Sequence, residues 1–202
     1  MLSVALTGNV AAGKSTVATL FQAWGAQLID SDQLVREVQA PGTPVLLSIV
    51  RRFGAGVLRP DGALDRGQLR AIVLADPQAL ADLNALVHPA VRRRSQERLA
   101  QLRAEGARIV VTDIPLLYEA ADPARFDAVV LVDAPVEVRR QRLFERSGLP
   151  AHEAERLMAA QLPSAHKRER AHYVIDNDAD VATLERRARE VWNALEARAS
   201  AA

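Results

Sequence analysis

The feature that most constrains this chain is a glycine-containing loop, residues 8–15, which directly follows a short apolar run. Its sequence, GNVAAGKS, matches the pattern G-x-x-x-x-G-K-[ST] at every fixed position. In such a loop Gly8 allows a sharp turn off a strand, and Gly13 lets backbone N–H groups approach a phosphate. Lys14 adds a positive charge near the β- and γ-phosphates, and Ser15 offers a hydroxyl to Mg²⁺. The motif predicts a phosphate-binding loop (P-loop) for a nucleoside triphosphate.

The residues on either side of the phosphate-binding loop favour this prediction over a chance glycine-rich turn. Residues 2–6 form an apolar run that is typical of a buried strand. After the loop, apolar residues recur at helical spacing: Val17, Leu20, Phe21 and Trp24. Gly25 then stands where a helix commonly ends. The motif therefore lies between a strand and a helix, which is the context that its chemistry requires.

Apolar runs alternate with helical patterns along the rest of the chain, which is typical of an α/β protein with a parallel sheet. Further strands are predicted at residues 27–30, 108–113, 128–132 and 173–175. A closing amphipathic helix is predicted from residue 181 onward. The predicted fold class is α/β, with a three-layer P-loop core around five parallel strands.

Two helical segments interrupt this core. The second and third strands are separated by roughly 75 residues without a strand pattern, which is too long for a simple connection. We interpret residues 31–107 as a helical subdomain inserted in the sheet. A second helical segment, residues 139–166, is rich in arginine and is interpreted as a lid. The predicted core of this single P-loop unit then comprises residues 1–30, 108–138 and 167–202.

The composition excludes several kinds of protein. The formal net charge is +1, so no global field favours nucleic acid or a membrane surface as a partner. The chain has no cysteine, which excludes disulfides, thiolate metal sites and cysteine nucleophiles. It has no apolar run near the roughly 20 residues that cross a bilayer, and no basic segment of a signal peptide at its start. We expect a cytoplasmic protein, and a monomer is favoured because no heptad run or apolar stripe argues for assembly.

Three carboxylates follow predicted strands. Asp113 ends the third strand, where P-loop proteins hold Mg²⁺ through an acidic residue, although a turn or cap role is the alternative. Asp30 and Asp32 follow the second strand, where a carboxylate can accept the proton of a substrate hydroxyl. Either aspartate can instead cap the helix that begins near Gln33. Because the two side chains point in different directions, both roles can coexist.

Among P-loop proteins, the absent motifs leave small kinases as the best-supported class. The chain has no guanine-reading N-K-x-D motif, no D-x-x-G after the third strand and no L-S-G-G-Q signature. Arg139, Arg142 and Arg146 lie on one face of a predicted helix. Arginines that converge on a transferring phosphoryl group stabilise its spreading charge. A solvated helix face, with Glu137 and Glu145 interleaved, is the alternative.

Six stretches in a fixed order extend over nearly the whole chain. They are LTG entering the phosphate-binding loop, IDSD at 29–32, GALDR at 62–66, LNALVHP at 83–89, DIPLLYE at 113–119 and VIDN at 174–177. Together they resemble the dephospho-CoA kinase family. The His-Pro and Pro-Leu-Leu-x-Glu stretches make this resemblance much more specific than the loop alone.

The resemblance implies transfer of the γ-phosphate of ATP, with Mg²⁺, to the ribose 3′-hydroxyl of dephospho-CoA, the last step of coenzyme A synthesis. A nucleoside or nucleoside-monophosphate kinase is the alternative, because it shares the core, the insert and the lid. The implied catalytic residues are Asp32 as the base, Lys14, Arg139 and Arg142. The implied ATP-binding residues are Gly8, Ala11, Ala12, Gly13, Lys14, Ser15 and Thr16, and the implied Mg²⁺ ligands are Ser15 and Asp113. The implied acceptor-binding residues are Asp32, Arg66, His88, Pro115 and Leu116.

One binding candidate has an alternative role, and three residues differ from the family pattern. A helix start is the alternative role for His88, which precedes Pro89. The family often has glycine and serine where Ala11 and Ala12 stand, and alanine adopts a positive φ less readily than glycine. His172 stands where the family usually has aspartate, in a region that we expect to pack near the adenine.

Overall fold

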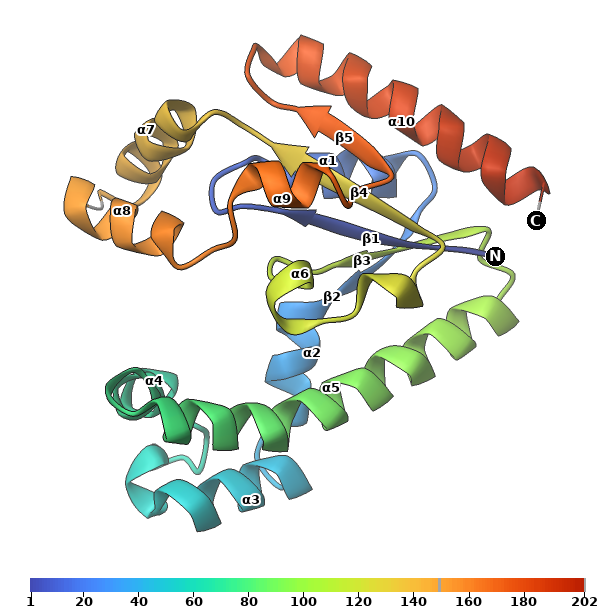
Figure 1. The fold of residues 1–202 in the computed structure, drawn as a ribbon. Coiled ribbons are helices and arrows are strands. Elements are labelled where there is room, and N and C mark those ends of the chain that lie inside the picture. The colour runs from blue at the N-terminus through green and yellow to red at the C-terminus, as the bar shows by residue number, and fades with distance from the viewer. Residues whose placement is uncertain (149, 202) are drawn as a thin grey trace. The chain divides into compact units, whose positions relative to one another are not determined.

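The computed structural model describes residues 1–148 and 150–201, which form two compact units (Figure 1). Unit 1 comprises Met1–Ile29 and Leu102–Ala202, and unit 2 comprises Asp30–Gln101. Unit 2 overlaps the insert that was predicted at residues 31–107. The predicted lid segment belongs to unit 1.

Unit 1 is built on a five-stranded sheet in the order β2-β3-β1-β4-β5. Its strands are β1 (Leu2–Gly8), β2 (Gln27–Asp30), β3 (Ile109–Asp113), β4 (Ala128–Asp133) and β5 (Tyr173–Asp176). β1 pairs in parallel with β3 and β4, and β4 pairs in parallel with β5. The strand predictions and the α/β fold class are confirmed.

The strands separate two layers of apolar packing because successive side chains point to opposite faces of a sheet. In β1, Val4 and Leu6 join the main core, whereas Ala5 joins a smaller cluster on the other face. Helices α1 (Lys14–Ala23) and α10 (Val181–Ala201) cover the main-core face. The short helix α6 (Leu117–Ala120) packs on the opposite face, so the core has the three predicted layers.

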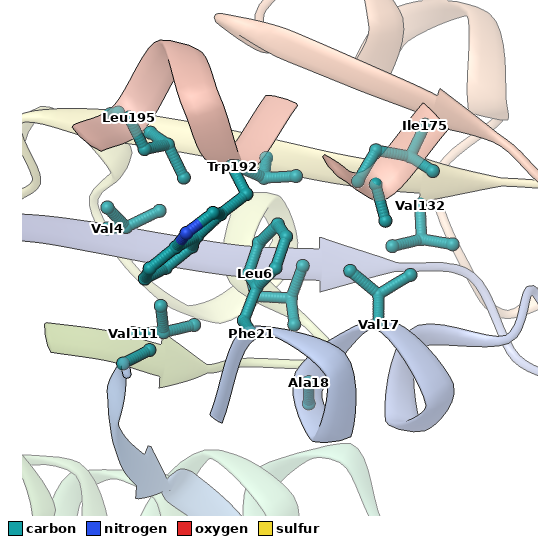
Figure 2. Packing of buried hydrophobic residues seen from close by; sticks show 14 of the residues in the cluster. Val4, Leu6, Val17, Ala18, Phe21, Val111, Val132, Ile175, Trp192 and Leu195 are labelled. Atoms are coloured by element: carbon teal, nitrogen blue, oxygen red, sulfur yellow. The ribbon is translucent and has the colours of Figure 1, made fainter. Parts of the chain in front are cut away.

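The main core places aromatic rings between α1, α10 and the sheet (Figure 2). Phe21 and Trp192 are almost fully buried, and their ring centroids are 5.5 Å apart with tilted planes. Such aromatic pairs contribute about 0.5–1.5 kcal/mol beyond the area that they bury. Val17 and Ala18 fill the same layer from α1. This packing fixes α1, and therefore the loop that precedes it, against the ends of the strands.

Unit 2 is helical and has an apolar core of its own. Its helices are α2 (Ser31–Val38), α3 (Pro44–Phe53), η1 (Ala55–Val57), α4 (Arg66–Ala75) and the greater part of α5 (Pro77–Ala104). Four of them follow residues with short polar side chains that accept backbone hydrogen bonds: Asp30, Thr43, Asp65 and Asp76. Ile49 and Val57 are fully buried in this core. Unit 2 therefore has the caps and the core of a folded subdomain.

The segment after β4 is helical, as predicted. It contains α7 (Val136–Ser147), α8 (Ala151–Ala159) and α9 (Ser164–Arg168). A short helix, η2 (Pro123–Arg125), lies before β4. α7 ends at Gly148, whose φ of 61° lies in the left-handed region that favours glycine. Within residues 1–148 and 150–201, none of the helices combines the length and the apolar character needed to cross a bilayer.

His172 completes the hydrogen bonding of β4 just before β5 begins. Its backbone N–H donates to the carbonyl of Val129 at 3.0 Å, and its Nδ1 accepts from the Val129 N–H at 3.1 Å. The parallel register places His172 toward the amino ends of the strands, whereas Gly8 lies at their carboxyl ends. This position gives no support to the expected packing of His172 near the adenine.

Replacing His172 with alanine is expected to lower the free energy of unfolding by about 1–3 kcal/mol, because the buried Val129 N–H would lose its acceptor. His172→Asp keeps a short acceptor at the same position and is the matched control, with a smaller expected loss. Urea unfolding of the two variants measures the difference. Equal stability of the alanine variant and the parent would contradict this role.

Candidate active site

The two glycines of the phosphate-binding loop occupy positions that only glycine fits. A Cβ on Gly8 would lie 2.5 Å from the carbonyl oxygen of Val132 on the neighbouring strand. Gly13 has a φ of 95°, and a Cβ there would collide with the side-chain amide of Asn177. Each glycine is therefore required by a close approach of other parts of unit 1.

The loop leads into the N-terminus of α1, which suits an anion. No side chain among the described residues caps this helix, and its first turn contains no acidic residue. Ser15 and Thr16 are exposed in that turn, at the positive end of the helix dipole. A helix N-terminus of this kind, following a glycine-rich loop, accommodates phosphate. The cradle fits the triphosphate that the motif predicts.

Lys14 forms an ion pair with Asp113, which connects the loop to the end of β3. The parallel register places Asp113 opposite Leu6, two residues before β1 ends at Gly8. Both charged side chains are only 16% exposed. A carboxylate oxygen is a hard ligand that Mg²⁺ prefers, and Lys14 Nζ is a suitable partner for phosphate oxygens. Lys14, which was predicted to bind phosphate, and Asp113, which was predicted to bind the metal, are thus brought together.

Asn177 and Arg142 hold the loop from the side of β5. Asn177 is 6% exposed, and its Nδ2 donates to the carbonyl of Ala12 at 2.8 Å. Arg142 donates to Asn177 Oδ1 at 3.1 Å and to the carbonyl of Ala11 at 3.4 Å. Asn177 belongs to the VIDN stretch at 174–177, but no local pattern in that stretch indicated this contact. Arg142 contacts the backbone of the loop rather than standing free in solvent.

A second polar network joins the loop to the connection between α8 and α9. Asn9 Nδ2 donates to Ser164 Oγ at 3.0 Å, and Ser164 Oγ donates to Asp133 Oδ1 at 2.8 Å. The Val10 N–H donates to Gln161 Oε1 at 2.8 Å. Sequence reasoning missed these residues. Of these residues, only Asp133 could have been selected from the sequence, because it is an acidic residue at the end of β4, as Asp113 is at the end of β3.

Arg168 strengthens this network by pairing with two strand-end carboxylates. Its Nη1 lies 3.0 Å from Asp133 Oδ2 and 2.6 Å from Asp176 Oδ1. The hydrogen bonds to Asp176 and Asp133 raise the pKa of Arg168. The guanidinium therefore stays charged and holds the ends of β4 and β5 to α9.

Arg139 is the most buried of the predicted lid arginines for which exposure is described. It is 5% exposed, and its Nε donates to the carbonyl of Ala134 at 3.1 Å. Burial lowers the pKa of Arg139, and Asp133 and Glu137 oppose part of that effect. Its buried Nη1 has no partner among the described residues, which suits a further anionic or carbonyl acceptor. The side chain of Arg146 lies outside the described part of the chain.

The Pro-Leu-Leu-x-Glu stretch also contributes to unit 1. Glu119 Oε1 lies 2.7 Å from Nζ of the fully buried Lys167 and accepts the Leu162 N–H at 3.0 Å. The carbonyl of Pro115 accepts from Thr7 Oγ1 at 3.5 Å, and Leu116 is 42% exposed. Glu119 therefore holds α9 and its preceding connection in place, whereas Leu116 is free for contact with a ligand.

In unit 2, the two aspartates after β2 have different roles. Asp30 caps α2, because its Oδ1 accepts the N–H groups of Asp32 at 2.8 Å and Gln33 at 3.1 Å. Asp32 then lies exposed in the first turn of the helix, and its carboxylate has no partner among residues 1–148 and 150–201. The question that the sequence left open is settled for Asp30, and Asp32 has the available carboxylate.

The other predicted acceptor residues of unit 2 are Arg66 and His88. Arg66 begins α4, and its Nη1 donates to Gln39 Oε1 at 2.8 Å. His88 lies within α5, and burial, with a smaller effect of Arg92, lowers the pKa of His88. The alternative role of His88 at a helix start is wrong, because Pro89 also lies inside the same helix.

Ala11 is the one non-glycine residue with a positive φ in the described part of the chain, at 60°. The left-handed conformation costs an alanine about 1–2 kcal/mol. Ala11→Gly is therefore expected to raise the free energy of unfolding by about 1 kcal/mol. Ala12→Gly is the matched control, because buried Ala12 has no positive φ and should lose stability instead. Urea unfolding measures both, and a destabilised Ala11→Gly variant would contradict the strain at this position.

A family model and individual relatives match this chain over most of its length, and they agree on one family. A sequence model of the dephospho-CoA kinase family matches residues 2–183. The chain is 51% identical over 177 residues to a dephospho-CoA kinase of Anaeromyxobacter dehalogenans, covering 88% of this chain and 84% of that protein. It is 46% identical over 199 residues to a dephospho-CoA kinase of Streptomyces avermitilis, covering 98% of this chain and 96% of that protein.

Among solved structures, a Thermus thermophilus protein superposes with a TM-score of 0.84 at 35% identity, over 96% of both chains. The similarity to this protein therefore holds for the backbone as well as for the sequence. The resemblance that the ordered motifs indicated is confirmed: the chain belongs to the dephospho-CoA kinase family.

Proposed function

We propose that this chain transfers the γ-phosphate of ATP to the ribose 3′-hydroxyl of dephospho-CoA, releasing ADP and coenzyme A. As a member of the family it is a kinase that uses ATP with Mg²⁺ and acts on small-molecule substrates. The observation that carries the proposal is the ion pair of Lys14 with Asp113 beside the loop of residues 8–15. It joins a phosphate ligand and a metal ligand at one end of the sheet.

On the donor side, backbone N–H groups of the phosphate-binding loop and the N-terminus of α1 would hold the phosphates of ATP. Lys14 would bind phosphate oxygens, and Ser15 with Asp113 would provide oxygen ligands for Mg²⁺. When bound, Mg²⁺ would offset the negative charge of the phosphates. No group of three or more His, Asp or Glu side chains suited to a metal occurs among the described residues. Two protein ligands supplemented by phosphate and water oxygens are a common arrangement for Mg²⁺.

Arginines of α7 would complete the donor side. Arg142 already contacts the loop, and the buried Nη1 of Arg139 has an unused donor. Charged donors placed in this way stabilise the charge that develops on a transferring phosphoryl group. Thr16 and Ala12 would contribute as backbone of the loop and of the helix N-terminus.

On the acceptor side, Asp32 would accept the proton of the ribose hydroxyl as it attacks. Its carboxylate is exposed and unpartnered among the described residues, and Asp32 lies two residues after the end of β2. Arg66, His88, Pro115 and Leu116 would contact the acceptor. The lowered pKa of His88 keeps its imidazole neutral near pH 7, so it would serve as a hydrogen-bonding group rather than a cation. We also propose that residues 31–107 form the acceptor-binding subdomain and residues 139–166 the lid.

Coupled measurement of ADP release with dephospho-CoA tests the proposal. We expect saturable turnover that requires Mg²⁺, and little turnover with nucleosides or nucleoside monophosphates. Turnover with a nucleoside monophosphate and none with dephospho-CoA would favour the alternative kinase, which the family match does not support. We further propose a cytoplasmic monomer, which size-exclusion chromatography with light scattering would test for its oligomeric state.

A further inference from the structure

Unit 2 contains three arginines that come together without carboxylate partners. Arg36 lies in the last turn of α2, Arg59 follows η1, and Arg66 begins α4. None of them forms an ion pair with a carboxylate of the described residues. We call Arg36, Arg59 and Arg66 the arginine cluster.

Hydrogen bonds with neighbouring polar groups hold two of these arginines, Arg59 and Arg66, in place. Arg66 Nη1 donates to Oε1 of Gln39, which is 6% exposed and lies three residues beyond Arg36 at the end of α2. Arg59 Nη2 donates to the carbonyl of Leu64, two residues before Arg66. A turn closed by the Leu58–Leu64 bridge brings Arg59 back to the start of α4. These bonds hold Arg66 against the residue that ends α2, three residues after Arg36, and they hold Arg59 against the residues that lead into α4.

The electrostatics of Arg66 agree with this geometry. Burial, followed by the positive charges of Arg36 and Arg59, lowers the pKa of Arg66. Like charges that approach one another oppose folding, and an anion bound between them removes that repulsion. Asp61 and Asp65 lie nearby in sequence, but their Oδ1 atoms accept backbone N–H groups of Ala63 and Gln68. The cluster thus has guanidinium donors that no described acid neutralises.

The geometry points to the arginine cluster as a binding site for the diphosphate of the acceptor, a site that rests on the proposed function. Dephospho-CoA has a diphosphate between its nucleoside and its pantetheine arm, and this is the anionic part of that molecule. Planar guanidinium groups bind phosphate oxygens in a bidentate manner, and several of them match the two charges of a diphosphate. The cluster would then select acceptors that have a diphosphate over uncharged nucleosides.

The test is steady-state kinetics of Arg36→Gln, Arg59→Gln and the double variant, because both side chains are exposed and their loss should not disturb the core. We expect the KM for dephospho-CoA to rise about tenfold for each substitution, with the kcat and the KM for ATP within about twofold of the parent. Salt should raise the KM of the parent for dephospho-CoA, and it should do so less in the double variant. Arg66→Gln should show the same KM effect, with thermal unfolding as a check because Arg66 also binds Gln39.

Arg70→Gln and Arg51→Gln are matched controls. Both arginines are exposed in unit 2 and have no ion pair or hydrogen bond with a described residue. The inference is overturned if Arg36→Gln and Arg59→Gln leave the KM for dephospho-CoA unchanged, or if the controls raise it equally. It is also overturned if the KM for ATP rises in parallel, since that would indicate a general effect. A parent enzyme without turnover of dephospho-CoA would instead refute the proposed function, before any variant is compared.

Discussion

Replacing Asp32 with asparagine is expected to lower kcat by about 10²–10⁴-fold, the usual contribution of a general base. The affinity for ATP should remain within about twofold, because Asp32 belongs to unit 2 and the donor residues belong to unit 1. Asparagine keeps the size of the side chain but cannot accept a proton from the ribose hydroxyl. Single-turnover measurement with saturating substrates gives the rate, and fluorescent-nucleotide titration gives the affinity.

Asp30→Asn is the matched control for this prediction. Asp30 caps α2, and asparagine is an equally good N-cap, so this variant should keep both its stability and its rate. The two substitutions make the same chemical change two residues apart. If both variants lost the same fraction of kcat, the effect would come from the local structure of α2. If Asp32→Asn kept the parental rate, the chain would use another base or none.

The periodic parts of the fold could be predicted from the sequence. Strands such as Ile109–Asp113 are short runs of buried apolar residues, and α10 has one apolar stripe along its length. These patterns are local, because each strand or helix must bury an apolar face of its own, and the spacing of its apolar residues shows that face. The phosphate-binding loop was also predictable, since its glycines and Lys14 follow from the geometry of a phosphate cradle.

The polar contacts around the loop could not be predicted in the same way. Asn177 lies 165 residues from Ala12 in sequence, and Ser164 lies 155 residues from Asn9. Hydrogen bonds of this range depend on how β4, β5 and α9 are placed, and no local pattern encodes that placement. The sequence correctly predicted that one of the two aspartates, Asp30 or Asp32, would cap a helix. Which of them is the cap depended on the residue at which α2 begins.

The arginines of the predicted lid show the same limit. Helical spacing predicted a common face for Arg139 and Arg142, and both make contacts with backbone carbonyls of unit 1. Spacing alone could not distinguish such contacts from a solvated face, because charged neighbours such as Glu137 occur in either case. The structure shows that Arg139 is buried. This excludes, for Arg139, the solvated helix face that the interleaved acidic residues had made the alternative.

Replacing Lys14 with alanine is expected to lower kcat/KM for ATP by about 10²–10³-fold, the usual effect of removing one charged donor from a developing phosphoryl charge. The change also removes the positive charge beside Asp113, whose side chain is only 16% exposed. Thermal unfolding must therefore accompany the kinetics. We expect the loss of activity to exceed any loss that partial unfolding at the assay temperature could explain.

Replacing Asp113 with asparagine distinguishes the role of Asp113 from that of Lys14, because Asp113 would bind Mg²⁺ and Lys14 would bind phosphate in the proposed reaction. Losing a metal ligand should raise the Mg²⁺ concentration needed for half-maximal rate, whereas Lys14→Ala should weaken phosphate binding at any Mg²⁺ concentration. In stability, the double variant should lose less than the sum of the single variants, since the residues are in direct contact. If both single variants showed the same Mg²⁺ dependence as the parent, Asp113 would serve only to position Lys14. Its place at the end of β3 would then be structural rather than part of the metal site.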